Sequence, residues 1–255
     1  MVDPEFVYLA TIGMIFEIFV NIVIFFFIGL TIRKYQERKH RLTLYMLIIF
    51  LNLGLGVFFS MISKVLVVTI GLEYSHTVGF SQVPDDILYW FLLRIADFRF
   101  TFVFLTIGIY FSYVLKVRIF EDDYNKKHRI FIIIYSIFNG VYAIFGYIRG
   151  YTTLDTLAFL FIFLFMFIVY IPFANQTLKA YKSTDDPEFK KGFLALSLMA
   201  ICFIIILFCF FIDRMLVTIP GLEHGFTLFY FFGWISGSIG IGGAYYGYIK
   251  PRKKE

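Results

Sequence analysis

The sequence has 255 residues, of which 60% are hydrophobic and 22% aromatic, while only 16% are charged. A soluble domain of this length carries about 25% charged residues, so we expect the excess apolar surface to face lipid. The net charge of +5 would suggest an anionic partner in a soluble protein. In a chain this apolar we expect no nucleic-acid binding. The distribution of the charge along the chain is more informative than the net charge.

The apolar residues form seven long runs. A helix needs about 20 apolar residues to cross a bilayer. Segments of at least that length lie near 6–32, 42–70, 86–116, 130–149, 153–179, 190–217 and 225–249. The sequence therefore predicts an all-α membrane protein with seven transmembrane helices, in which residues 1–255 form a single membrane domain.

Lysine and arginine are concentrated in alternate connections between these runs. Short cytoplasmic loops are rich in Lys and Arg. The first, third and fifth connections and the C-terminal tail hold most of the 23 basic residues: Arg33, Lys34, Arg38, Lys39, Arg41, Lys116, Arg118, Lys126, Lys127, Arg129, Lys179, Lys182, Lys190, Lys191, Lys250, Arg252, Lys253 and Lys254. We therefore expect a multi-pass protein of the plasma membrane, with its N-terminus outside and its C-terminus in the cytoplasm.

Parts of the first and last thirds of the chain resemble each other in the same order. The pairs are 31–35 with 177–181, 64–73 with 214–223, and 110–113 with 245–248. They suggest a parallel duplication of three helices, with one linking helix between halves near 6–118 and 153–252. The alternative is convergence of apolar, aromatic-rich helix ends.

Several ionisable residues lie inside the predicted spans, where each costs about 2.5–3.5 kcal/mol at the bilayer centre. They are Glu17, Lys64, Arg94, Asp97, Arg99, Asp213 and Arg214. Counted at 1.5 Å per residue from the outer ends of the spans, these residues gather in the outer half of the bundle. This grouping favours an outward-facing polar cavity or ion path over a purely structural network. Glu17, with Asn21 one turn further on, could instead be a polar pair that packs two helices.

The third span places Arg94 and Asp97 three residues apart, so on a continuous helix they share a face and can pair. Thr101, one turn further in, extends that face. Arg99 points elsewhere and therefore needs another partner or water.

The third span also carries a family resemblance. Residues 88–101 read LYWFLLRIADFRFT. This segment resembles the third helix of microbial (type 1) rhodopsins, where Arg-x-Ala-Asp-Trp-x-x-Thr follows a Tyr-Trp pair. The resemblance implies a rhodopsin-like bundle with an outside N-terminus and two similar halves. It also implies that Arg94 and Asp97 occupy the counterion positions.

The seventh span supports the resemblance but lacks its central residue. Residues 235–242 resemble the family's segment around the retinal-binding lysine, and Ser238 stands at the lysine position. Trp234 stands where many members have a second aspartate, and Phe98 replaces one of the tryptophans that sandwich the chromophore. Because a hydroxyl cannot form a Schiff base, we expect no covalent retinal and no light-driven pumping. A non-covalent retinoid or lipid is the remaining cofactor class.

These features favour a non-photoactive, rhodopsin-like receptor or sensor for a small apolar or amphipathic ligand. Arg94 and Asp97 are expected at the polar end of a central pocket that opens toward the outer side. The expected pocket wall consists of Phe98, Trp234, Ser236 and Ser238. A cytoplasmic signalling partner would bind the basic loops, and a homo-oligomer is compatible with the sequence.

A carrier is the alternative function, for a small molecule or an ion. The parallel three-plus-one-plus-three layout also resembles the SWEET sugar transporters, whose helices hinge at prolines and carry a Pro-Gln motif. This chain has one deeply placed proline, Pro172, and no such dipeptide. Neither an enzyme nor a metal site is expected, because the sequence offers no nucleophile–base pair and its four histidines lie in or beside loops.

Overall fold

In the computed structural model, the described residues are 4–72, 74, 86–120, 125–146, 148–219 and 225–249. Their regular structure is entirely helical. The helices are α1 (Pro4–Arg38), α2 (Arg41–Ile70), α3 (Ile87–Ala96), α4 (Arg99–Phe120), α5 (Lys126–Phe145), α6 (Thr152–Ser183), α7 (Pro187–Val217), α8 (Leu228–Ala244) and the π-helix η2 (Tyr245–Ile249).

Six of the described helices, α1, α2, α4, α5, α6 and α7, are long and apolar enough to cross a membrane. The predicted class, an all-α multi-pass membrane protein, is therefore confirmed. Helix α8 has 17 residues and continues directly into the five residues of η2.

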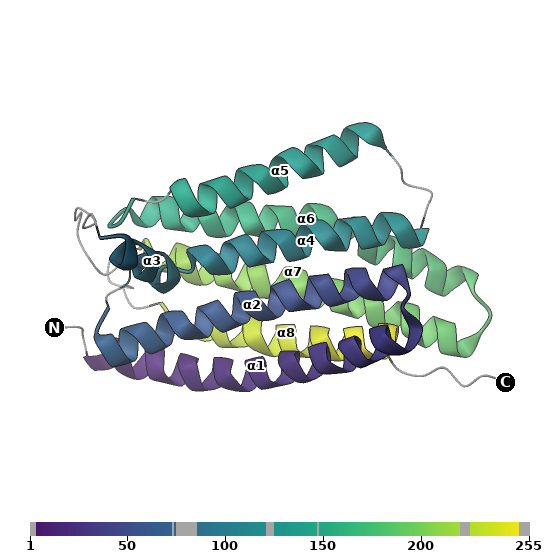
Figure 1. The fold of residues 1–255 in the computed structure, drawn as a ribbon, viewed down its shortest axis with the longest axis horizontal. Helices are drawn as coiled ribbons and strands as arrows, with labels where there is room; N and C mark the ends of the chain where they lie inside the picture. The colour runs from purple at the N-terminus through teal and green to yellow at the C-terminus, as the bar shows by residue number, and fades with distance from the viewer. Residues whose placement is uncertain are drawn as a thin grey trace.

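The long helices run side by side in one bundle, and α1 begins at the opposite end from the one where η2 finishes (Figure 1). Helices α1, α2 and α4 pack in chain order, as do α6, α7 and α8. Contacts between α4 and α6 and between α1 and α8 join the two groups. Helix α5 packs against α4 and α6 on the outside of the bundle, and many of its apolar side chains, such as Ile134 and Phe145, are exposed. These side chains are placed to face lipid.

Local signals in the sequence account for several helix ends. The Asp186 carboxylate accepts hydrogen bonds from the backbone N–H groups of Glu188 (2.7 Å) and Phe189 (3.3 Å), which caps the start of α7. Gly71 ends α2 in the left-handed conformation, with φ of 72°. The Lys34 ammonium on α1 donates to the carbonyl groups of residues 248 and 249, and thereby satisfies acceptors at the end of η2.

The third predicted span is interrupted, and this corrects the expectation of one continuous helix over 86–116. Helix α3 ends at Ala96, Asp97 forms its C-terminal cap, and α4 begins only at Arg99. Between them, Phe98 has a φ of 62°, and a bulky residue in this region costs about 1–3 kcal/mol. Because of the break, the expectation that Thr101 extends the helix face of Arg94 and Asp97 was wrong: Arg94 and Asp97 belong to α3 and its C-terminal cap, and Thr101 belongs to α4.

Helices α7 and α8 approach closely because α8 is rich in glycine. A Cβ atom added at Gly243 would lie 2.8 Å from the Ala195 carbonyl oxygen of α7, whereas one added at Gly242 would meet nothing within 4 Å. Small residues at such positions let membrane helices pack backbone to backbone. This packing fixes where the side chains of α8 enter the interior.

Candidate ligand-binding cavity

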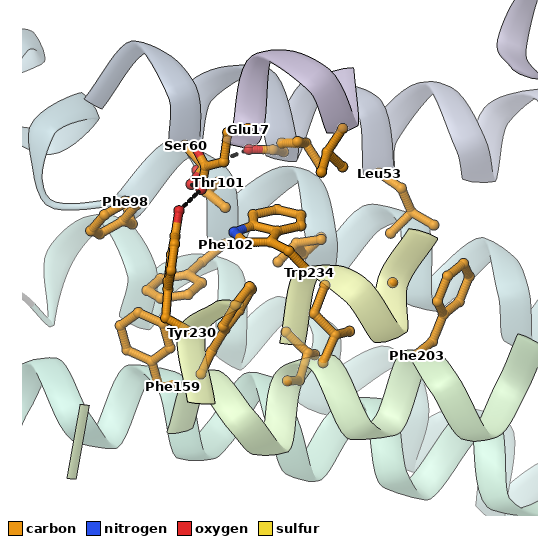
Figure 2. A pocket seen from close by; sticks show the side chains of 18 of the residues that line it. Glu17, Leu53, Ser60, Phe98, Thr101, Phe102, Phe159, Phe203, Tyr230 and Trp234 are labelled. Atoms are coloured by element: carbon orange, nitrogen blue, oxygen red, sulfur yellow. Dashed lines mark hydrogen bonds between the residues drawn. The ribbon is translucent and has the colours of Figure 1, made fainter. Parts of the chain in front are cut away.

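A cavity of about 90 Å³ lies inside the bundle (Figure 2). Its lining comes from α1, α2, α4, α6, α7 and α8, together with Phe98 from the break between α3 and α4. None of the described lining residues belongs to α5. Most of them are apolar, so the cavity is a hydrophobic space shared by both groups of helices.

The cavity is long and narrow. On α7 its lining runs from Phe203 to Arg214, and on α8 from Tyr230 to Ile241. Each of these stretches covers about 16 Å along a helix. A volume of about 90 Å³ spread along such a lining makes the cavity narrow, so it suits a chain-shaped ligand better than a broad ring system.

The carboxylate of Glu17 is the centre of the polar end of the cavity. Its Oε1 accepts hydrogen bonds from the Tyr230 hydroxyl (2.6 Å) and the Ser60 hydroxyl (2.9 Å), as the dashed lines in Figure 2 mark. It also accepts from the Lys64 ammonium at 2.8 Å. The Oε2 atom is buried and has no hydrogen-bond partner among the described residues. One oxygen of a cavity-lining carboxylate is therefore unused.

Lys64 lies just beyond the lining and neutralises Glu17. Both side chains are fully buried, and Nζ also lies 3.3 Å from the Ser60 hydroxyl. The ammonium is 4.8 Å from the centre of the Phe98 ring and 5.2 Å from that of Tyr230, distances at which aromatic faces stabilise a cation. Charge pairing and aromatic contacts together keep this lysine in an apolar interior.

A second pair of charged residues, Asp213 and Arg214, lines the same end from α7. The Asp213 carboxylate accepts from the backbone N–H (2.7 Å) and the hydroxyl (2.8 Å) of Thr227, the residue before α8. The Arg214 guanidinium lies 5.2 Å from the centre of the Phe98 ring and 5.3 Å from that of Phe159. Asp213 therefore anchors the start of α8 beside the cavity, and Arg214 packs against aromatic rings of the lining.

Aromatic rings cover the polar end on the side of the α1 N-terminus. Tyr74, in the segment after α2, stacks on Phe98 with ring centres 5.5 Å apart and packs edge-on against Phe6 at the same distance. Phe226 contacts both Phe6 and Tyr230. A ligand that enters from this end must move these rings.

Neither Arg94 nor Asp97 is among the described residues that line the cavity. The Arg94 guanidinium donates to the Ile144 carbonyl of α5 at 3.1 Å and lies 3.5 Å from the centre of the Trp90 ring. Asp97 is buried at the end of α3. The polar end expected from these two residues is instead built by α1, α2, α7 and α8.

Arg99 finds the separate partner that the sequence required. Its guanidinium pairs with the Asp155 carboxylate of α6, and both side chains are buried. Neither residue is in the described lining. This pair joins α4 to α6 and is positioned to stabilise the bundle.

The remaining predicted residues divide between the cavity and its surroundings. Thr101 lines the cavity and donates to the Gly56 carbonyl at 3.1 Å. Asn21 donates to the Glu17 carbonyl at 2.9 Å and to the Val57 carbonyl at 3.5 Å, which ties α1 to α2 outside the described lining.

Of the predicted wall, Phe98 and Trp234 line the cavity. The Ser236 hydroxyl donates to the Cys202 carbonyl (3.2 Å), and the Ser238 hydroxyl donates to the Trp234 carbonyl (3.0 Å). Both serines therefore bond to backbone, and neither belongs to the described lining.

Sequence reasoning missed three residues that complete these contacts. Ser60 lies four residues before Lys64, so helical spacing could have placed the two on one face. Tyr230 is one of 18 tyrosines, and nothing in its neighbourhood marks it. Asp155 lies in the first turn of α6, where an acidic residue is common, and nothing in the sequence connects it with Arg99.

No group of three His, Cys, Asp or Glu side chains able to hold a metal ion occurs in the described part of the chain. The polar end thus combines paired charges, hydroxyl groups and one unused carboxylate oxygen with an apolar channel.

No protein-family model matches the sequence, and no match was found among curated proteins or among solved structures.

Proposed function

We propose that this protein is a non-photoactive, rhodopsin-like membrane receptor or sensor that binds a small amphipathic molecule in the central cavity. The observation that carries the proposal is an apolar channel inside the bundle with a buried carboxylate at one end. Small-molecule sites are typically apolar, with a few polar groups that orient the ligand. Since Glu17 is neutralised by Lys64, the arrangement suits binding rather than catalysis.

The proposed architecture has seven crossings, with α8 and η2 together forming the last. Their 17 and five residues reach the length of about 20 that a crossing needs. An odd number of crossings fits a chain in which α1 begins at one end of the bundle and the last helix finishes at the other end (Figure 1). The basic connections favour a cytoplasmic C-terminus and an outside N-terminus in the plasma membrane. The polar end of the cavity then lies in the outer half.

A duplicated three-plus-one-plus-three bundle would explain the position of the cavity. Helices α1, α2 and α4 form one wall, and α6, α7 and α8 form the other. Binding sites commonly occur at the interface between such repeats. With Ser238 at the lysine position, the ligand is held without a covalent bond, and the narrow channel favours a lipid-like chain over a retinoid ring.

Stability measurements in lipid nanodiscs test this proposal. The purified protein is analysed by native mass spectrometry for co-purifying small molecules, and its thermal unfolding is followed with and without the extracted material. The cavity is blocked with Val57→Phe, because Val57 lines it from α2. The matched control is Val141→Phe, since Val141 lies on α5 and is 52% exposed.

We expect the extract to raise the Tm of the wild type and of Val141→Phe but not that of Val57→Phe. If Val57→Phe folds and responds to the extract as the wild type does, the ligand does not occupy this cavity. Uptake of the ligand by protein-containing liposomes would instead identify a carrier.

A further inference from the structure

Two buried polar atoms of cavity-lining residues lack a hydrogen-bond partner, and one is an acceptor while the other is a donor. Glu17 Oε2 is an acceptor, and the Trp234 indole Nε1–H is a donor. Both are buried. Glu17 Oε2 makes no hydrogen bond to any described residue, and the indole N–H lies near the Tyr230 hydroxyl without meeting the geometry of a hydrogen bond. In Figure 2 the indole nitrogen is on the side of the cavity where Tyr230 and Glu17 lie. Because buried polar groups are normally hydrogen-bonded, these atoms point to a ligand group that both donates and accepts.

The charge at this end argues against an ionic headgroup. Glu17 is paired with Lys64, and Asp213 is adjacent to Arg214 along α7. The formal charges of these four residues sum to zero. An ammonium or carboxylate on the ligand would therefore add an uncompensated charge to a space of low dielectric constant, which is unfavourable. A neutral group avoids this cost.

The shape of the cavity restricts the rest of the ligand. The lining beyond Trp234 toward Ile241 and Phe203 is apolar and extends for about two further turns of α8. An unbranched hydrocarbon chain matches a narrow channel of this length.

Given the proposed ligand-binding function, on which this step rests, we propose that the ligand is a neutral alcohol with an unbranched hydrocarbon chain. Its hydroxyl donates to Glu17 Oε2 and accepts from Trp234 Nε1, and its chain extends toward Ile241. The site thus recognises a hydroxyl by hydrogen bonding, without using a net charge.

Four probes of equal chain length test the headgroup: 1-octanol, octylamine, octanoic acid and n-octane. Saturable binding of each to the protein in nanodiscs is measured by calorimetry, with empty nanodiscs as the blank and Val57→Phe as the blocked cavity. We expect 1-octanol to bind at least about tenfold more tightly than n-octane, because a hydrogen bond to a charged group contributes that much. Octylamine and octanoic acid should bind more weakly than 1-octanol.

Two variants test the two contacts. Trp234→Phe keeps an aromatic ring but removes the donor, and should weaken 1-octanol binding roughly two- to tenfold with n-octane unaffected. The double variant Glu17→Gln/Lys64→Met removes the carboxylate together with the lysine that neutralises it, so no unpaired charge remains. It should reduce the ratio of the affinity for 1-octanol to that for n-octane.

The outcomes separate this inference from the proposed function. Binding of n-octane or octylamine equal to that of 1-octanol, or an alcohol preference unchanged in both variants, overturns the hydroxyl assignment while the cavity remains a binding site. If no probe binds saturably, or if Val57→Phe binds all of them as well as the wild type does, both proposals fail.

Discussion

The buried pair of Glu17 and Lys64 gives the sharpest test of how α1 packs against α2. The two charged atoms lie 2.8 Å apart and both side chains are fully buried. At an effective dielectric constant of 20, their attraction is about 6 kcal/mol, most of which offsets the cost of removing both charges from water. Loss of one partner leaves the other charge buried and uncompensated. We therefore expect Lys64→Met alone to lower the free energy of unfolding by about 3–5 kcal/mol.

A double-mutant cycle measures this coupling. Glu17→Gln, Lys64→Met and the double variant are unfolded by SDS in mixed micelles, and the free energies are compared. The double variant has no unpaired charge. The decrease in its free energy of unfolding should therefore be at least about 2 kcal/mol smaller than the sum of the decreases in the two single variants. The control is the exposed pair of Arg33 and Glu37, also in contact at 3.2 Å, whose coupling should be about 0.3–0.5 kcal/mol. A coupling for the buried pair no larger than that of the control would refute the reasoning.

Three further predictions address other parts of the molecule. Asp155→Asn should lower the free energy of unfolding by about 3–5 kcal/mol, because it leaves Arg99 buried without its carboxylate; the affinity for 1-octanol should not change, and a change would place this pair in the site. Gly243→Ala should destabilise the protein by about 1–3 kcal/mol, because the added methyl group overpacks against α7. Gly242→Ala is the unhindered control, and equal unfolding curves for the two variants would contradict the close packing of α7 and α8. Incubation with all-trans-retinal followed by borohydride should leave Lys64 unmodified, because its ammonium is buried and held by hydrogen bonds. A reduced adduct mapped to Lys64 by peptide analysis would contradict the expectation of non-covalent binding.

The helices could be predicted because two simple signals dominate them. Long apolar runs mark the segments, and residues such as Asp186 and Gly71 mark ends through caps that depend only on local geometry. The break after Ala96 carries no such signal. It contains neither glycine nor proline, and Phe98 adopts a positive φ that its side chain disfavours. Tertiary packing of the ring against Tyr74 overrides the local preference there.

The polar residues could be identified from the sequence, but their partners could not. Any ionisable residue within an apolar run is a candidate, and on this basis Glu17 and Lys64 were singled out. Which residues pair depends on the rotation of each helix about its axis and on which helices are neighbours. Glu17 and Lys64 are 47 residues apart, and Arg99 is 56 residues from Asp155. No spacing rule within one helix reaches across such separations.

The break in the third span has a consequence for the rhodopsin resemblance. In that resemblance, Arg94 and Asp97 stand at counterion positions and should face the centre. Here the turn at Phe98 brings the ring of that residue to the cavity, while the Arg94 guanidinium bonds to α5. The carboxylate that faces the cavity is Glu17 of α1, and its neutralising cation, Lys64, comes from α2. The polar centre of this bundle is therefore built by the first two helices and not by the third, where the resemblance placed it. A centre built in this way is already neutral before any ligand arrives, so it needs no charged chromophore and is suited to a ligand recognised by a hydroxyl.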